Sequence, residues 1–448
     1  MEKTFKKKWR KLDNSAKIFP LNESRRYSTV FRYSVVLKEN VDKEILEKAV
    51  EKALNRYKEF KVRMRSGFFW DYLEENNKKP VIQEEFYYPC KKIDPIFNHD
   101  YLFKVTYFER KINIDVFHSL TDGSGALVFF REIVYNYLEM KHKELMDKEE
   151  RKVRKIEFDT EDSYVANFDK KTKRNKGSKK GYVLKGRELK LGQVSANHLL
   201  INSSDLKKEC EKYNLSTTQY LTSILVLSVY NANIKKYEKK HKNKRPLKVC
   251  IPVNLKKYYK SKTMSNFFSY ISVDAEMDVC ESFEKIADFV RSEFEKKLTE
   301  EEILKTMSNN VKIGRNIFIS FIPLFLKRII IRSIYREIQR YLSITYSNVG
   351  KIGIIGKYQD YIDYFLVMIA PEYIEKIKCS SCSFQDRIAL SFTSILNDNS
   401  IERYFYDYLI SKNIAVEVES NGVLESITKK EKQKGKRKEK NDISKKTK

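Results

Sequence analysis

A histidine, an aspartate and two glycines stand close together in the segment His-Ser-Leu-Thr-Asp-Gly-Ser-Gly, from His118 to Gly125. An unperturbed histidine has a pKa near ~6.5, so at neutral pH much of its imidazole is uncharged and can take a proton from a hydroxyl or an amine. A helix N-terminus directly after the histidine would favour the neutral ring further. These residue types therefore favour general base catalysis by His118.

The flanking residues predict that this segment joins a strand to a helix. Apolar and polar residues alternate from Lys111 to Val116, which is typical of a strand. From Ala126 to Leu138 apolar residues recur at spacings of three and four, which is typical of a packed helix. Between them, Asp122 can cap the helix, while Gly123 and Gly125 allow a sharp turn or a close approach to a ligand. Such strand-to-helix junctions often carry the chemistry of α/β proteins.

The segment resembles the HxxxDG motif of the chloramphenicol acetyltransferase-like acyltransferases, which include alcohol acetyltransferases and the condensation domains of nonribosomal peptide synthetases. His118, Asp122 and Gly123 match the motif residue for residue. The resemblance implies acyl transfer from a coenzyme A thioester to a hydroxyl or an amine, with His118 as the base. It gives Asp122 a structural role, in which an ion pair holds the loop. The sequence does not name the basic partner of Asp122.

Two other segments are similar to the same superfamily. The opening residues Trp9 to Leu21 resemble the N-terminal signature of bacterial alcohol acetyltransferases. Residues Lys248 to Val273 predict a strand, a polar loop and a second strand, and resemble the PVNLR and GNFF-like region. Lys256 stands where arginine is usual, and it keeps the charge without the bidentate fork. Ser265 stands where glycine is usual, directly before Asn266.

A further resemblance concerns Ser347-Asn348-Val349-Gly350, which follows a predicted strand at Leu342 to Tyr346. It resembles a serine-asparagine-glycine turn near the active tunnel of related acyltransferases. We therefore take Asn266, Ser347 and Asn348 as candidate polar groups of the donor tunnel. A tight turn would explain Ser347 and Asn348 equally well.

The resemblance extends over most of Trp9 to Gly422 and implies an α/β fold of two lobes. Each lobe is expected to be a mixed sheet flanked by helices, with the active-site tunnel between the lobes. The predicted organisation is a first lobe at residues 1–145, a charged inter-lobe crossover at 146–190, a second lobe at 191–425 and a basic, disordered tail at 426–448.

The chain of 448 residues carries a formal charge of +28. No helix-turn-helix, zinc-finger or RNP-like pattern accompanies this charge, so a nucleic-acid reader is not predicted. Coenzyme A phosphates, an acidic acyl carrier protein and an anionic membrane surface are the candidate partners. The strongly apolar, then basic stretch from Ile317 to Ile334 is predicted to be a helix buried against the second lobe's sheet. The alternatives are a helix on a membrane surface and the lining of a lipophilic pocket.

Other chemistries remain as alternatives. His118 and Asp122 are four residues apart and could share a metal ion, but the glycines favour a loop and no metal is predicted. Ser119 and Ser124 flank the motif, but the G-x-S-x-G elbow of a serine hydrolase is missing. An acyl-phosphopantetheine carrier protein is the alternative donor to acyl-coenzyme A, and a non-catalytic binding protein of the same fold is the contrasting hypothesis.

The cysteines bear on the expected compartment. Six are scattered along the chain without a disulfide framework, and the N-terminus has no apolar signal-peptide core, so a cytoplasmic protein is expected, with membrane attachment at most peripheral. Cys379 and Cys382 form a C-x-x-C pair without a second pair, and we interpret them as structural.

Overall fold

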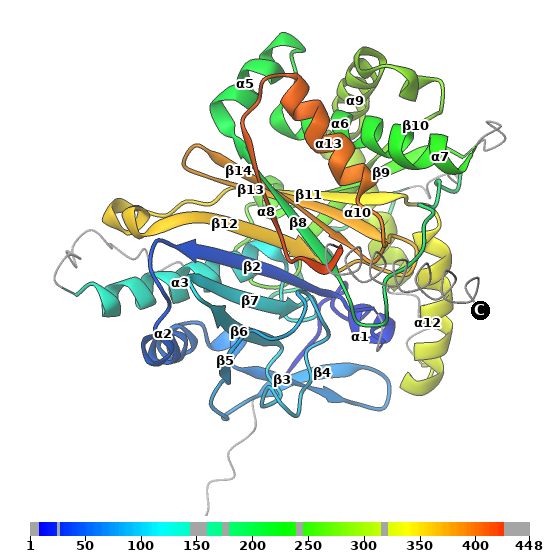
Figure 1. Ribbon diagram of the computed structural model, residues 1–448. Helices are drawn as coiled ribbons and strands as arrows, with labels where there is room; N and C mark the ends of the chain where they lie inside the picture. Colours follow the sequence, from blue (N-terminus) through cyan, green and yellow to red (C-terminus); the bar gives the residue numbers. More distant parts are fainter. Residues whose placement is uncertain are drawn as a thin grey trace, which may run out of the picture.

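The computed structural model describes residues 9–24, 27–143, 159–172, 179–238, 245–314 and 321–424. In this part of the chain the strands form a five-stranded, a seven-stranded and a three-stranded sheet (Figure 1). The predicted tail at 426–448 and parts of the predicted crossover at 146–190 lie outside the described residues.

The first lobe is built on the five-stranded sheet, which has helices packed against it. In spatial order its strands are β12 (Ile362–Ile369), β2 (Val30–Leu37), β7 (Lys111–Phe117), β6 (Phe103–Phe108) and β5 (Ile82–Glu84). The packed helices are α2 (Lys43–Arg56) and α3 (Gly123–Lys141), whose apolar faces share one core with the sheet. The three-stranded sheet has the order β1 (Trp9–Lys11), β4 (Asp71–Glu75), β3 (Val62–Ser66).

The second lobe is built on the seven-stranded sheet. Its strands, in spatial order, are β10 (Phe268–Ala275), β9 (Leu247–Asn254), β11 (Ile344–Lys351), β13 (Ile377–Phe384), β14 (Arg387–Ser394), β8 (Ser195–Asn202) and β15 (Val416–Ser420). The helices that share its core are α5 (Ser203–Lys212), α6 (Thr217–Val229), α9 (Phe283–Lys297) and α13 (Ser400–Ser411). Ser216 caps α6 in a capping box with Gln219.

Strand β12 joins the two lobes. It follows β11 in sequence, yet it pairs antiparallel with β2 in the first lobe's sheet. Its backbone also accepts hydrogen bonds from the second lobe, including Ser380 Oγ to the Val367 carbonyl at 2.7 Å and Cys382 Sγ to the Phe365 carbonyl at 3.3 Å. Cys382 therefore faces the first lobe's core, whereas Cys379 lies in the second lobe's core. The two cysteines of the C-x-x-C pair point away from each other.

The turn predicted at Ser347 to Gly350 is wrong. β11 continues through Ser347 and Asn348, because both pair in parallel register with Ser380 and Ser381 of β13. The irregularity of the strand comes later, between Asn348 and Lys351.

The prediction for the stretch from Ile317 to Ile334 is also wrong where the structure describes it. Helix α12 (Leu324–Gln339) begins after Pro323 and packs against α1 (Phe19–Asn22) at the periphery of the molecule, not against the second lobe's sheet (Figure 1). Its buried residues include the polar Lys327 and Gln339, while most of its large apolar side chains are exposed. Apolar periodicity alone does not show which face of a helix is buried.

Candidate functional site

His118 directly follows β7, on the side of the first lobe that meets the second. Its ring stacks on Phe19 at a centroid distance of 4.5 Å, and Phe31 and Phe268 lie at 4.9 and 5.6 Å. Its backbone N–H donates to the carbonyl of Thr29 at 3.1 Å. These contacts from both lobes fix the plane of a partly buried imidazole.

Asn266 sets the tautomer of His118. The Asn266 amide Nδ2 donates to the His118 backbone carbonyl and to Asp13 Oδ2, each at 3.0 Å, so its Oδ1 must be the acceptor. That oxygen lies 3.0 Å from His118 Nδ1, which therefore carries the hydrogen. Nε2 then holds the free lone pair, and among the described residues it has no hydrogen-bond partner. A neutral ring with an available Nε2 is the form that a general base requires.

Asp13 is a site residue that the sequence analysis missed. Its Oδ2 accepts from both the backbone N–H and the side chain of Asn266, at 3.1 and 3.0 Å, and its Oδ1 accepts from Ala16 N at 2.8 Å. Burial raises the pKa of Asp13 to about 6, although the hydrogen bonds from Asn266 and Ala16 oppose the rise. The only signal was its position within the N-terminal segment that resembles the alcohol acetyltransferases.

The surroundings of His118 favour its neutral form. Burial lowers the pKa of the imidazole below its ordinary value, because the apolar surroundings disfavour a charged ring. The hydrogen bond to Asn266 and the charge of Asp122 oppose this effect without reversing it. His118 is therefore largely unprotonated at neutral pH.

Asp122 caps α3 and ties the motif to the second lobe. Its Oδ1 accepts from Gly125 N, Ser124 Oγ and Lys256 Nζ at 2.9, 2.7 and 2.8 Å, and its Oδ2 accepts from Phe267 N at 3.0 Å. Burial alone would raise its pKa, but the Lys256 charge and these hydrogen bonds hold it below its ordinary value. With both oxygens engaged in this way, the carboxylate is placed to hold the loop.

Lys256 is the basic partner that the sequence left unnamed. It begins the short helix α8 (Lys256–Tyr259), which follows β9, and its side chain and that of Asp122 are both largely buried. The PVNLR-like segment had marked Lys256 as a position where a charge is usual. Nothing in the sequence connected that charge with Asp122.

Of the two glycines after Asp122, Gly125 is the one that close packing requires. Both lie in the first turn of α3, and neither has a positive φ. A Cβ on Gly125 would lie 2.1 Å from Thr121 Oγ1 and 2.9 Å from the Met264 carbonyl, whereas one on Gly123 would lie 3.1 Å from Tyr33 Oη. Gly125 thus lets the first turn of α3 approach the segment that leads into β10.

The hydroxyl groups of Ser119 and Ser124 form hydrogen bonds with groups other than His118. Ser119 Oγ donates to the Ala16 carbonyl at 3.1 Å, and Ser124 Oγ donates to Asp122. No hydrogen bond joins either hydroxyl to the imidazole in the described structure, so the geometry gives no support to a serine nucleophile. Within the same residues, no cluster of three or more His, Cys, Asp or Glu side chains is arranged to hold a metal ion.

The three candidates for the donor tunnel occupy different places. Asn266 contacts His118, whereas Asn348 Nδ2 donates to Thr218 Oγ1 at 2.9 Å, at the start of α6. Ser347 is opposite Ser380, whose hydroxyl faces β12, so strand alternation places Ser347 on the face toward the first lobe. Neither Ser347 nor Asn348 has a hydrogen bond to His118 in the described structure.

Strands β9 and β11 separate close to these residues. They pair only at Ile344 with Val249 and at Thr345 with Cys250, although β9 continues to Asn254 and β11 to Lys351. Beyond these pairs, the β11 segment with Ser347 and Asn348 pairs with β13 alone. The seven-stranded sheet therefore opens next to two of the predicted donor residues.

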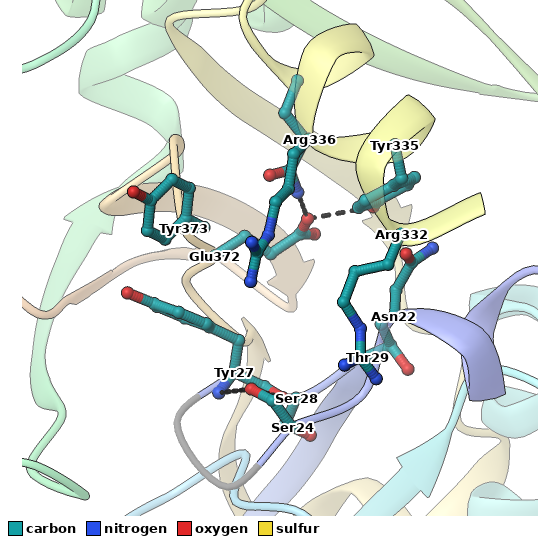
Figure 2. Close-up of a pocket in the computed structure, with 11 residues that line it drawn as sticks. Asn22, Ser24, Tyr27, Ser28, Thr29, Arg332, Tyr335, Arg336, Glu372 and Tyr373 are labelled. Atoms are coloured by element: carbon teal, nitrogen blue, oxygen red, sulfur yellow. Dashed lines mark hydrogen bonds between the residues drawn. The ribbon is translucent and has the colours of Figure 1, made fainter. Parts of the chain in front are cut away.

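Two hollows lie beside residues that contact or precede His118. One lies between α12 and the loop before β2, and Thr29, Arg332 and Glu372 are among its lining residues (Figure 2). The other has a volume of about 350 Å³ and is lined by Phe117, Arg332 and residues of the first lobe. Arg332 lines both hollows and donates to the carbonyls of Leu21 and Glu23 at 3.3 and 3.2 Å.

A buried network of polar groups borders the first hollow. Glu372 accepts a hydrogen bond from Tyr335 Oη at 2.9 Å (Figure 2). It also accepts from Lys378 Nζ at 2.6 Å and from Gln339. Lys378 also faces Glu375 at 3.2 Å, and its positive charge contributes to the lowered pKa of His118. Among the residues that line the hollow, Tyr335, Gln339 and Glu372 are thus already paired with one another.

No family model matches the chain, and no curated protein is found to be similar to it in sequence. Solved structures are similar over most of the chain. The TRI3 trichothecene 15-O-acetyltransferase from Fusarium sporotrichioides has a TM-score of 0.59 at 10% identity, with 92% of this chain and 96% of that chain covered. TRI101 of F. graminearum, complexed with coenzyme A and deoxynivalenol, has a TM-score of 0.59 at 11% identity, with 91% and 99% covered.

The wax ester synthase/diacylglycerol acyltransferase from Marinobacter aquaeolei has a TM-score of 0.51 at 10% identity, with 90% of this chain and 100% of that chain covered. At these identities the likeness shows the fold alone. It confirms the predicted fold class: the chain has the two-lobed fold of the chloramphenicol acetyltransferase-like and condensation superfamily.

Proposed function

We propose that this protein is an acyltransferase that moves an acyl group from acyl-coenzyme A to the hydroxyl or amine of a small or lipophilic acceptor. The observation that carries the proposal is the hydrogen bond between His118 Nδ1 and Asn266 Oδ1, which leaves Nε2 free as a base. His118 stands in an HxxxDG motif, at a position where both lobes contact it.

The reaction needs one proton to move twice. Nε2 of His118 takes the proton of the acceptor O–H or N–H while the acceptor atom attacks the thioester carbonyl carbon. The tetrahedral intermediate then expels the sulfur as the C–S bond breaks. The protonated imidazole returns its proton to the leaving thiolate, so the products are the ester or amide and free coenzyme A. A thioester is already activated, so no covalent acyl-enzyme is needed.

The neighbouring residues hold the base in place. Asn266 and Asp13 keep the hydrogen on Nδ1, so that the lone pair stays on Nε2. The Asp122–Lys256 pair fixes the loop after His118 and the first turn of α3. Neither residue of that pair transfers a proton in this mechanism.

Coenzyme A as the donor is supported by the similar TRI101 structure, which is described with coenzyme A bound. The separation of β9 from β11 offers strand edges on which an extended amide chain such as pantetheine can find hydrogen-bond partners. Ser347 faces the first lobe in this region, and we retain it as a candidate polar group beside the thioester. Asn348 bonds Thr218, so its role is in shaping that region.

The reaction class is tested by the release of free thiol from acetyl- and longer acyl-coenzyme A in the presence of a panel of alcohols and amines. Acceptor-dependent release, together with an ester or amide product identified by mass, supports the proposal. Thiol release without an acceptor product would indicate a thioesterase instead. If coenzyme A thioesters give no product, the same assay with acyl carrier proteins separates a carrier-dependent transferase from a non-catalytic protein of this fold.

A further inference from the structure

The N-terminal half of α12 exposes large apolar side chains to solvent. Phe325 and Ile329 are each 66% exposed, and Leu326 and Ile330 are 42% and 43% exposed. Their spacing places them on one face of the helix. Large apolar side chains gathered on one surface usually mark a site of interaction.

The hairpin between β3 and β4 extends this surface. Phe68 is 71% exposed and Phe69 is 40% exposed. The hairpin is fastened to α12, because Leu324 N donates to the Phe68 carbonyl and Lys327 Nζ to the Phe69 carbonyl, each at 2.9 Å. Two segments far apart in the sequence thus bring apolar side chains together. We call this surface the α12 patch, and it consists of Phe68, Phe69, Phe325, Leu326, Ile329 and Ile330.

The charges on α12 indicate the chemistry of the partner. From Leu324 to Arg340 the sequence has five basic residues and one acidic residue. Arg328, Arg336 and Arg340 are exposed, and although Asp71 and Glu337 pair with two of them, the helix remains basic. A helix with an apolar face and flanking basic residues is typical of helices that lie in the interface of an anionic membrane.

We propose that the α12 patch docks the protein on the surface of an anionic lipid bilayer. α12 lies in the plane of the interface in this arrangement, with Phe325 and Ile329 in the acyl region and Arg336 and Arg340 at the headgroups. No helix of the described residues is long and apolar enough to cross a membrane. The proposal therefore concerns attachment to one face of the bilayer.

A second copy of the chain is a poorer occupant of the same surface. In a twofold dimer the α12 patch would meet itself, so the basic residues of the two copies would also lie close together. Like charges at such an interface oppose association. An anionic bilayer satisfies both the apolar and the basic groups.

The inner face of the same helix lines the hollows beside the site. Arg332, Tyr335 and Gln339 border the hollow that includes Thr29, and Arg328 and Arg332 border the one that includes Phe117. Docking through α12 would therefore bring the bilayer close to the approach to His118. The role of the bilayer in catalysis rests on the proposed function. A lipophilic acceptor would reach the site from the bilayer.

Vesicle co-sedimentation tests the docking independently of catalysis. The full-length protein is mixed with vesicles of phosphatidylcholine alone and with vesicles that also contain phosphatidylglycerol. We expect binding to the anionic vesicles. The Phe325→Glu/Ile329→Glu double variant should lose about tenfold or more in binding, because charges replace two apolar groups that the bilayer buries on docking. The matched control is Ile410→Glu/Val418→Glu, which makes the same change at exposed positions of the second lobe and should bind as the wild type does.

The outcomes separate this proposal from the proposed function. His118→Ala should bind vesicles normally, and the Phe325→Glu/Ile329→Glu variant should keep its activity on a water-soluble acceptor. Unchanged vesicle binding in that variant would overturn the docking site. The absence of any vesicle binding would also overturn it, as would a dimer, observed by sedimentation velocity, that dissociates in the double variant. None of these results would bear on acyl transfer.

Discussion

His118 and Asn266 are joined by two hydrogen bonds that run in opposite directions. The imidazole Nδ1 donates to Asn266 Oδ1, and Asn266 Nδ2 donates back to the backbone carbonyl of His118, each at 3.0 Å. One side chain from the second lobe thus fixes both the ring and the backbone of the proposed base. The geometry of the proposed base therefore depends on how the lobes are held together.

Asn266→Ala removes both bonds and frees the ring to rotate and change tautomer. We expect kcat to fall by roughly tenfold to a hundredfold with a much smaller change in KM, because misplacement of a catalytic group acts on the transition state. Steady-state kinetics measure kcat and KM separately. A fall in the free energy of unfolding with unchanged kcat would show that Asn266 stabilises the fold without positioning His118.

Lys256→Met leaves the largely buried carboxylate of Asp122 without its cation. The free energy of unfolding should fall by about 3–5 kcal/mol, as is typical when one partner of a buried pair is lost. Lys43→Met, which removes the cation of the exposed pair with Glu47, is the control and should cost less than about 1 kcal/mol. Urea denaturation measures both, and a double-mutant cycle with Asp122→Asn isolates the coupling. Equal losses in Lys256→Met and Lys43→Met would refute the structural role of the pair.

Alanine at the two motif glycines should have unequal effects. Gly125→Ala places a methyl group against Thr121 Oγ1 and the Met264 carbonyl, so a stability loss of about 1–3 kcal/mol is expected from overpacking. Gly123→Ala meets only Tyr33 Oη at 3.1 Å and gains helix propensity, so it should be the milder change. Thermal unfolding of the two variants compares them directly. The reverse order would mean that the first turn of α3 packs differently from the arrangement described.

The pH dependence of kcat/KM should have its acid limb below pH 6.5. Burial lowers the pKa of His118 from its ordinary 6.5, so the ring loses its proton at a lower pH than a free histidine and Nε2 remains available there. As the pH falls through this lowered pKa, the base is protonated and the rate declines. A limb at or above pH 6.5 would contradict the burial of a neutral imidazole.

The titration of Asp13 should make the free energy of unfolding vary with pH in the direction opposite to that of kcat/KM. Its pKa is about 6 in the folded protein against 3.8 for a free side chain, so the folded state binds the proton more tightly. Its contribution to stability is present below pH 3.8 and is lost as the pH rises through about 6. Comparing urea denaturation of wild type and Asp13→Asn across this range should show that the variant lacks this trend. Identical pH profiles would mean that Asp13 is not the titrating group.

The sequence predicted local features well and distant contacts poorly. The change of periodicity from Lys111 to Leu138 predicted the strand, the helix and the place of His118, because each depends on neighbours along the chain. Asp13 and Asn266 are 253 residues apart, and Lys256 and Asp122 are 134 apart. Such contacts arise only from the packing of the lobes, so Asp13 was missed and Lys256 was not paired.

The two wrong structural predictions have a common cause. The residues around Ser347 have the composition of a turn, but the pairing of β11 with β13 keeps them extended. The apolar residues of α12 suit a buried helix, but the polar Lys327 faces inward and donates to the hairpin carbonyl of Phe69. In both cases tertiary contacts overrode a local preference.

The most direct test of the central claim is the rate of acyl transfer by His118→Ala with a donor and acceptor that the wild type uses. We predict a loss of about 10²- to 10⁴-fold in kcat, because Nε2 supplies the base. The variant should still fold, with a lower Tm, since it also loses the ring contacts with Phe19 and Phe268 and the bond to Asn266. Ser119→Ala, the adjacent control, should retain most activity. Undiminished transfer by His118→Ala would contradict the account.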